Sequence, residues 1–367
     1  YNGECQEGVG YFQRTIANGR RISTARAFLN PVRNRPNLEI RTKAHVEKII
    51  FEDKKAIGVF YSINNNKFIV RARKEIILSG GSVNSPQLLQ VSGVGPADLI
   101  RSLGVPVIHD LPAVGQNLSD HYGVRVSARV KNQRTINERS RGFNLAKEVA
   151  NYIFRRKGIL SLSPSLVYIF WKSQKIMQNP DLQMIFTPAS YKEGVPSQLD
   201  DFPGMTVAAW PMRPESSGFV NSRTADIRDK PIIQPNYLEH ENDQRVLLAG
   251  IKLMRQMLKT PEISKWYDQE EVPGIDIETD SDLLDFARER GTTFFHLIGT
   301  CRMGPNKNKN TVVSDELKVH GIESLRVVDA SIMPKMPSAN TNASTIMIAE
   351  KASDMILGNS PLEKSYI

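Results

Sequence analysis

The stretches FHLIGTCRMG at 295–304 and SANTNAS at 338–344 frame the most informative part of the chain. A strand-like run at 324–328 and a proline-interrupted loop lie between them, and a helix is predicted over 343–357. His296 stands before a Gly-Thr turn, and Asn340 stands just before the predicted helix. We therefore predict that His296 and Asn340 meet at one site.

The residue types at these two positions suit acid–base chemistry, although each also has a purely structural interpretation. A neutral imidazole beside an apolar wall, here 292–295, is a good general base near neutral pH. The alternative is an ordinary core histidine. Asn340, Thr341 and Asn342 are favoured residues for capping a helix, and the helix dipole would also stabilise an anion at this end.

A second informative stretch is SGGSVNSPQLLQVSGVG at 79–95. Its pattern predicts a strand, a glycine turn and the start of a helix. Glycines allow a ligand to approach the backbone, and a helix N-terminus favours negative charge, which suits a nucleotide diphosphate. A packed strand–helix crossover without a ligand is the alternative. The chain contains no GxGxxG motif.

Composition indicates an ordinary globular protein with one large domain or two packed domains. The 367 residues are 40% hydrophobic and 24% charged, with a net charge of +9. Basic residues are scattered, and the longest basic run is FRRK at 154–157, so nucleic acid binding is not expected. Cys5 and Cys301 provide neither a disulfide framework nor a metal spacing, and Cys301 is interpreted as a core residue.

The chain has no apolar run long enough to span a membrane. It begins at Tyr1 without an initiator methionine, so we expect an N-terminal portion, with any targeting signals, to lie outside it. A cytoplasmic or peripheral membrane location is expected.

Alternating patterns predict a β-meander of short strands near the N-terminus, followed by a buried strand at 74–79. The meander strands are Leu38–Thr42, His45–Phe51, Ala56–Ser62 and Lys67–Ala72. Helices are predicted at 23–29, 84–91, 97–103, 243–258 and 281–290, the last closed by Gly291. Further strands are predicted at 124–130, 182–187 and 205–210. The runs 141–154 and 162–172 are interpreted as helical or mixed.

The remaining histidines show no partner spacing and are interpreted as structural or solvated. They are His45, His109, His121, His240 and His320.

Taken together, these motifs resemble the glucose–methanol–choline (GMC) family of FAD-dependent oxidoreductases over nearly the whole chain. The residues that carry this resemblance are Gly81–Gly95, GQNLSDH at 115–121, HLIGTCRMG at 296–304, VVDAS at 327–331 and the run from Asn340 to Glu350. Within the family, the choline-dehydrogenase-like and aliphatic alcohol dehydrogenase branch is the most similar.

The resemblance implies an α/β (α+β) fold with two domains. A GMC-type FAD-binding domain, incomplete at its N-terminus, would comprise 34–124 and 305–367. A substrate-binding domain built on a large sheet backed by helices would comprise 1–33 and 125–304.

The resemblance also implies roles for named residues. His296 would accept the alcohol proton while hydride passes to flavin N5, and Asn340 would hold the substrate oxygen. Val46 would meet the adenine through its backbone, and Ser79 and Gly80 would lie near the adenosine. The remaining cofactor-binding residues would border the pyrophosphate, ribityl chain and isoalloxazine: Phe295, Asp329, Ala330, Thr341 and Asn342.

The implied partners are a small-molecule alcohol and an electron acceptor, either a quinone, another acceptor or oxygen. A family hydroxynitrile lyase that keeps FAD without redox chemistry, and a non-catalytic fragment, are the alternatives. Because the family's glycine-rich βαβ unit is absent, we expect this chain alone to bind FAD poorly. A cage for the trimethylammonium group of choline would draw on Tyr168, Trp171, Trp210 and Glu215, although ordinary packing explains each of them.

Overall fold

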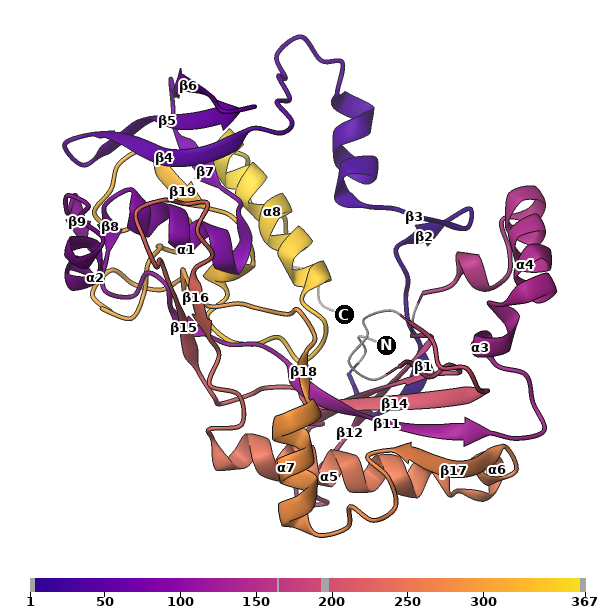
Figure 1. Ribbon diagram of the computed structural model, residues 1–367. Coiled ribbons are helices and arrows are strands. Elements are labelled where there is room, and N and C mark those ends of the chain that lie inside the picture. Colours follow the sequence, from indigo (N-terminus) through magenta and orange to yellow (C-terminus); the bar gives the residue numbers. More distant parts are fainter. Residues whose placement is uncertain (1–3, 164, 193–197, 364–367) are drawn as a thin grey trace. The chain divides into compact units, whose positions relative to one another are not determined.

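The computed structural model describes residues 4–163, 165–192 and 198–363, which form two compact units (Figure 1). Unit 1 comprises Tyr1–Ile40, Tyr122–Met212 and Glu241–Thr293. Unit 2 comprises Arg41–His121, Arg213–His240 and Phe294–Ile367. Among the described residues, no helix has both the length and the apolar character needed to cross a bilayer.

Unit 1 is organised around one antiparallel sheet. Its strand order is β1–β12–β13–β14–β11–β17, and β18 also pairs with β11. The bounds are Gly8–Tyr11 (β1), Val167–Trp171 (β12), Leu182–Thr187 (β13), Gly204–Pro211 (β14), Tyr122–Val130 (β11), Tyr267–Val272 (β17) and Thr292–Thr293 (β18). Every residue of β14 is buried. The central strand is therefore covered on both faces.

Helix α5 (Glu241–Leu258) packs against β11, β13 and β14 and against helix α7 (Asp280–Arg290). Its buried positions include Val246, Leu247, Ile251 and Met254, which recur at helical spacing. Gly250 allows close packing, because a Cβ there would lie 2.9 Å from Leu182 Cδ1. The large sheet backed by helices is thus confirmed.

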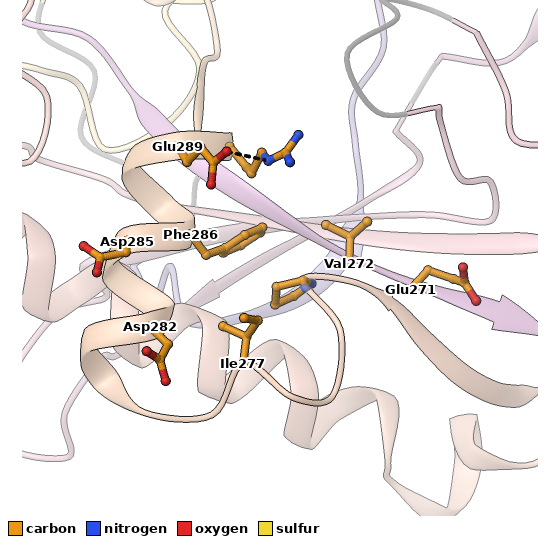
Figure 2. Close-up of a pocket in the computed structure, with 9 residues that line it drawn as sticks. Glu271, Val272, Ile277, Asp282, Asp285, Phe286 and Glu289 are labelled. Atoms are coloured by element: carbon orange, nitrogen blue, oxygen red, sulfur yellow. Dashed lines mark ion pairs between the residues drawn. The ribbon is translucent and has the colours of Figure 1, made fainter.

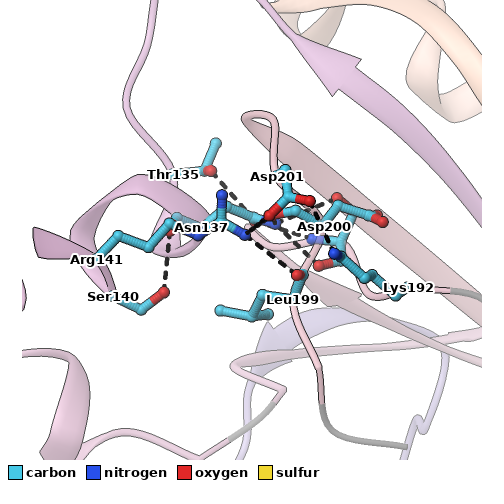
Figure 3. A network of polar contacts seen from close by, with 9 residues as sticks. Thr135, Asn137, Ser140, Arg141, Lys192, Leu199, Asp200 and Asp201 are labelled. Carbon is cyan, nitrogen blue, oxygen red and sulfur yellow. Dashed lines mark hydrogen bonds and ion pairs between the residues drawn. The ribbon is translucent and has the colours of Figure 1, made fainter. Parts of the chain in front are cut away.

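The rest of unit 1 consists of short elements and one long helix. They are β2 (Ile16–Ala17), β3 (Arg20–Arg21), η1 (Ala25–Leu29), η2 (Asn30–Val32), α3 (Ile136–Arg139), α4 (Gly142–Arg155), η3 (Ile159–Ser161) and α6 (Pro261–Ser264). A polar network holds the α3–α4 junction (Figure 3). In it Asn137 Nδ2 donates to the carbonyls of Ser190 and Asp200, and Arg141 donates to the Asp200 carbonyl and pairs with Asp201.

Unit 2 contains a parallel pair, β7 (Ile76–Leu78) with β19 (Leu325–Val327), beside a core of buried aliphatic residues. The meander is β4 (His45–Glu52), β5 (Lys55–Ile63) and β6 (Asn66–Arg71). The other strands are β8 (Val94–Gly95), β9 (His109–Asp110), β10 (Gln116–Leu118), β15 (Gly218–Asn221) and β16 (Ile232–Gln234). The helical elements are α1 (Gly81–Val91), α2 (Ala97–Ser102), η4 (Ala330–Ile332) and α8 (Asn342–Leu357).

Two local predictions are wrong. Residues 38–42 form no strand and lie largely exposed before β4, because they have no pairing partner in the meander. The run 162–172, predicted to be helical or mixed, contains strand β12 and no helical residue in its described part; Pro164 falls outside the described residues. Its apolar residues lie between β1 and β13, so tertiary pairing decides their conformation.

Gly291 does close α7, but not by adopting a left-handed conformation. Its φ is −67°, and the need for glycine is steric. A Cβ at this position would lie 2.3 Å from the ring of Tyr122.

Candidate active site

The glycine turn and the VVDAS segment meet at the carboxyl ends of the parallel strands β7 and β19. Ser79 and Gly80 follow β7, whereas Asp329 and Ala330 follow β19. Such a parallel strand edge is where α/β sheets commonly bind ligands. The structure thus brings together four of the residues predicted to contact the cofactor.

The buried carboxylate of Asp329 organises this edge through its two oxygens. Asp329 Oδ2 accepts hydrogen bonds from the Gly81 amide at 2.9 Å and from Ser85 Oγ at 2.6 Å. Its Oδ1 accepts from the Ser331 amide at 2.8 Å. Asp329 therefore shapes the turn that begins α1, rather than presenting a free charge. Gly81 has a φ of +79°, and the space where a Cβ would stand is open.

His296 lies on the segment after β18 and is held by its backbone. Its amide donates to Asp120 Oδ1 at 2.8 Å, and Tyr237 Oη donates to Asp120 Oδ2 at 2.5 Å. Burial lowers the pKa of His296 from 6.5 to about 4. The imidazole is therefore neutral at physiological pH, as a general base requires.

Asn340 lies beside His296, as predicted, because the loop before α8 returns to the 294–304 segment. Asn340 Nδ2 donates to His296 Nε2 over 3.1 Å. A nitrogen that accepts a hydrogen bond carries a lone pair, so Nε2 of His296 is the basic atom. Thr341 is buried and Asn342 is exposed at the start of α8, and the first turn of this helix contains no acidic residue.

His121, the last residue of the GQNLSDH motif, completes this group, although it was interpreted as structural or solvated from the sequence. Its Nδ1 lies 2.9 Å from His296 Nδ1, and the two rings meet edge to face with centroids 5.0 Å apart. His121 is fully buried. A neutral His296 with a lone pair on Nε2 carries its proton on Nδ1, so it donates to His121 Nδ1.

The register of two short segments explains this contact. Ser119 pairs with Ile298 in an antiparallel bridge, which places His121 opposite His296 two residues further along. The Phe294 amide then donates to the His121 carbonyl at 2.9 Å. Asp120, His121 and Tyr237 were missed because a single sequence does not reveal pairing between segments so far apart.

Two further features near His296 fit a bound ligand. The side chain of Phe295 is 79% exposed, and its backbone has a φ of +60°, an uncommon conformation for a bulky residue. Asn117 Nδ2 is buried without a hydrogen-bond partner among the described residues. The Asn117 carbonyl lies so near Gly299 that a Cβ there would approach it to 2.2 Å. An exposed ring and an orphaned donor suit a planar cofactor that carries acceptor atoms.

Val46 lies in β4 opposite Tyr61, in the same unit as the other predicted site residues. Cys301 is fully buried, and burial raises the pKa of its thiol, so it is a core residue and not a nucleophile. No three His, Cys, Asp or Glu side chains within the described ranges gather closely enough to hold a metal ion.

Unit 1 has a separate surface pocket of about 340 Å³ beside α7, lined by none of these residues (Figure 2). Three of its carboxylates have cationic partners. Glu271 pairs with Arg129, Asp285 with Arg288 and Glu289 with Arg290. The fourth carboxylate, Asp282, accepts a hydrogen bond from Thr279, so the acidic lining of the pocket is partly neutralised.

Comparison with known proteins identifies relatives for the whole chain. Family models described as GMC oxidoreductase match residues 1–123 and 214–349. An alcohol dehydrogenase [acceptor] of Pseudomonas putida is 40% identical over 97% of this chain and 65% of its own length. An oxygen-dependent choline dehydrogenase of Cronobacter sakazakii is 39% identical over 99% of this chain and 65% of its own length.

Solved structures agree with this result. A formate oxidase of Aspergillus oryzae, solved to study FAD modification, aligns with a TM-score of 0.89 and 27% identity over 98% of this chain and 66% of its own. An FAD-dependent oxidoreductase of Chaetomium thermophilum aligns with a TM-score of 0.84 and 26% identity over 96% of this chain and 67% of its own. The chain thus spans about 65% of the length of the curated relatives.

Proposed function

Because the chain belongs to the GMC oxidoreductase family, we propose that it carries the catalytic residues of an FAD-dependent enzyme that oxidises an alcohol to an aldehyde. The predicted family and its cofactor, FAD, are confirmed by the comparisons. The observation that carries the proposed activity is the neutral His296, whose Nε2 lone pair faces the Asn340 amide at 3.1 Å.

The residues present fit FAD. The glycine turn at 79–81, with open space at Gly81, would lie near the adenosine; the Asp329–Ala330 edge would border the pyrophosphate and ribityl portions, and the backbone of Val46 would meet the adenine. The exposed ring of Phe295 and the first turn of α8, with Thr341 and Asn342, would border the isoalloxazine. When bound, FAD supplies the hydride acceptor.

Side chains of this chain account for the removal of the substrate hydroxyl proton. His296 Nε2 takes the proton of the substrate hydroxyl as the α-carbon gives up its hydride and the carbonyl bond forms. Asn340 Nδ2 donates to the alcohol oxygen and keeps it beside His296. The proton on His296 Nδ1 stays hydrogen-bonded to His121, which fixes the ring orientation.

We propose uncharged primary alcohols as the substrate class. Trp210 and Tyr168 are buried in the sheet of unit 1, and Glu215 of unit 2 lies 3.3 Å from His240. Burial leaves the rings of Tyr168 and Trp210 closed to a trimethylammonium group, whereas Trp171 of the same sheet is 39% exposed. The second substrate would be a quinone, another acceptor or oxygen.

A test uses the protein expressed from its full reading frame and loaded with FAD. Anaerobic mixing with a panel of primary alcohols should bleach the flavin absorbance, and an artificial acceptor should restore it. Cyanohydrin cleavage without bleaching would instead assign lyase activity. Absence of both reactions would leave no support for an enzymatic role.

A further inference from the structure

Helix α4 presents its apolar face to solvent and its polar face to the protein. Phe154, Phe143 and Ile153 are 84%, 76% and 57% exposed, and Leu145 and Val149 are also exposed. These residues recur at helical spacing along Gly142–Arg155 and form one apolar face. Helix α5 of the same unit has the opposite and usual orientation, with its apolar residues buried against the sheet.

The inward face of α4 is held by polar contacts, so its orientation is well determined. Glu148 is buried and accepts hydrogen bonds from Arg139 Nε at 2.9 Å and from the Ile159 amide at 3.0 Å. A Cβ on Gly158 would lie 2.2 Å from Glu148 Oε2. Rotating the apolar face inward would bury it only by removing these contacts, so the exposed face is a fixed property of unit 1.

Positive charge surrounds this face. Residues 134–160 contain seven Lys or Arg and two Glu, a net charge of +5 out of +9 for the chain. Both carboxylates have partners nearby. Glu148 pairs with Arg139, and Glu138 accepts a hydrogen bond from the Thr135 amide at the start of α3. Lys147, Arg155, Arg156 and Lys157 have no ion-pair partner among the residues described.

Two of these cations lie along aromatic rings of the same helix. Lys147 Nζ lies 4.9 Å from the ring centre of Phe143, and the Arg156 guanidinium lies 5.0 Å from that of Tyr152. Lys147, Phe154 and Arg155 also line a surface hollow of about 460 Å³. Cationic groups thus stand directly beside the apolar side chains.

We propose that α4 is a membrane-docking helix that inserts its apolar face into a bilayer surface rich in anionic phospholipid. Interfacial helices combine a continuous apolar face, aromatic side chains and flanking Lys or Arg, and α4 has all three. A second copy of the chain is disfavoured as the occupant, because two-fold pairing of these faces would bring like charges together.

Vesicle sedimentation tests the proposal with the FAD-loaded protein from the full reading frame. The probes are phosphatidylcholine vesicles with and without about a third phosphatidylglycerol. The protein should bind the anionic vesicles and be released by high salt. Phe143→Ser with Phe154→Ser should lower binding at least about tenfold, and so should neutralising Arg155, Arg156 and Lys157 to Gln.

The matched control is Ile176→Ser with Ile275→Ser, which removes two exposed apolar side chains of unit 1 outside α4 and should leave binding unchanged. Ile153→Cys carrying a polarity-sensitive dye, in a Cys5→Ser background, should report a less polar environment on vesicles. Failure of the unmodified protein to bind anionic vesicles would overturn the proposal. So would a fall in oligomeric mass of the Phe143→Ser, Phe154→Ser variant in vesicle-free solution, which would identify a second copy as the occupant.

Discussion

His296 and His320 are both at least half-buried histidines of unit 2, yet their Nε2 atoms have opposite roles. His320 Nε2 lies 3.1 Å from the Gly304 carbonyl, which can only accept, so this nitrogen carries a proton. His296 Nε2 faces the Asn340 amide, which donates, so this nitrogen carries a lone pair. One imidazole is a structural donor and the other is available as a base.

The difference shows that hydrogen-bond partners, and not burial, distinguish an imidazole that is available as a base from one that acts as a structural donor. His320 is satisfied by groups of its own neighbourhood, Gly304 and Thr311. His296 depends on residues that come from separate parts of the chain: Asp120, His121 and Asn340. These three contacts fix the His296 ring so that its basic Nε2 atom is held at one position.

The largest expected effect comes from removing the base. His296→Ala in the FAD-loaded protein should lower kcat/KM for the best alcohol at least about 10²-fold, the usual scale for acid–base catalysis. The flavin spectrum should be unchanged, since the side chain is not among the groups proposed to hold the cofactor. Turnover close to that of the unmodified enzyme would remove His296 from the mechanism.

The pH dependence is the next test, because the pKa of His296 is lowered to about 4. Alcohol oxidation should retain its base between about pH 5 and 8, and the acid limb of kcat/KM should lie near pH 4 rather than near 6.5. Folding stability should follow the same group. The unfolded state takes up a proton below about pH 6.5 whereas the folded state does not, so stability falls from there towards about pH 4.

Two neighbours of His296 can also influence the pH profile of kcat/KM. His121 contacts the His296 ring, and Asp120 accepts a hydrogen bond from the His296 amide. The Asn340→Ala variant isolates the contact at His296 Nε2, because it removes this donor and leaves the contacts with His121 and Asp120 in place. Its kcat/KM should fall less than that of His296→Ala. A limb near pH 6.5 in the unmodified enzyme would contradict the buried, neutral His296.

A smaller effect is expected from the Nδ1 contact between the two imidazoles. His121→Leu should lower kcat/KM roughly tenfold, about the worth of one hydrogen bond that orients the base. His121→Asn, whose amide oxygen can accept in place of Nδ1, should recover most of the loss. Imidazole ¹⁵N shifts should show the proton of His296 on Nδ1. A proton on Nε2 would exchange the roles of the two rings and refute the assignment.

Local patterns predicted much of the fold because they determine short-range structure. The helical spacing of 243–258 and the alternation at 182–187 predicted α5 and β13 closely. The run at 162–172 was misjudged because its apolar residues do not distinguish a strand between two others from a helix. That choice is made by β1 and β13, which are distant in sequence.

The site followed the same rule. His296 and Asn340 were predicted because each stands beside a visible turn or helix start, and the motifs supplied their pairing. His121 lies beside His296 because Ser119 pairs with Ile298. The sequence does not reveal this pairing, so His121 was interpreted as structural. The orientation of α4 was also hidden, since a helical pattern does not reveal which face of the helix is turned inward.

The smallest effect should come from the structural histidine. His320→Leu removes the donor to the Gly304 carbonyl and should lower the free energy of unfolding by about 1 kcal/mol, seen as a lower Tm. His320→Gln keeps an N–H in a similar place and should restore part of this loss. Neither variant should change kcat or its pH profile, because His320 contacts none of the proposed catalytic groups in the described structure. A kinetic defect in His320→Gln, with Tm retained, would mean that the two histidines act as one system, and the distinction drawn from their Nε2 partners would fail.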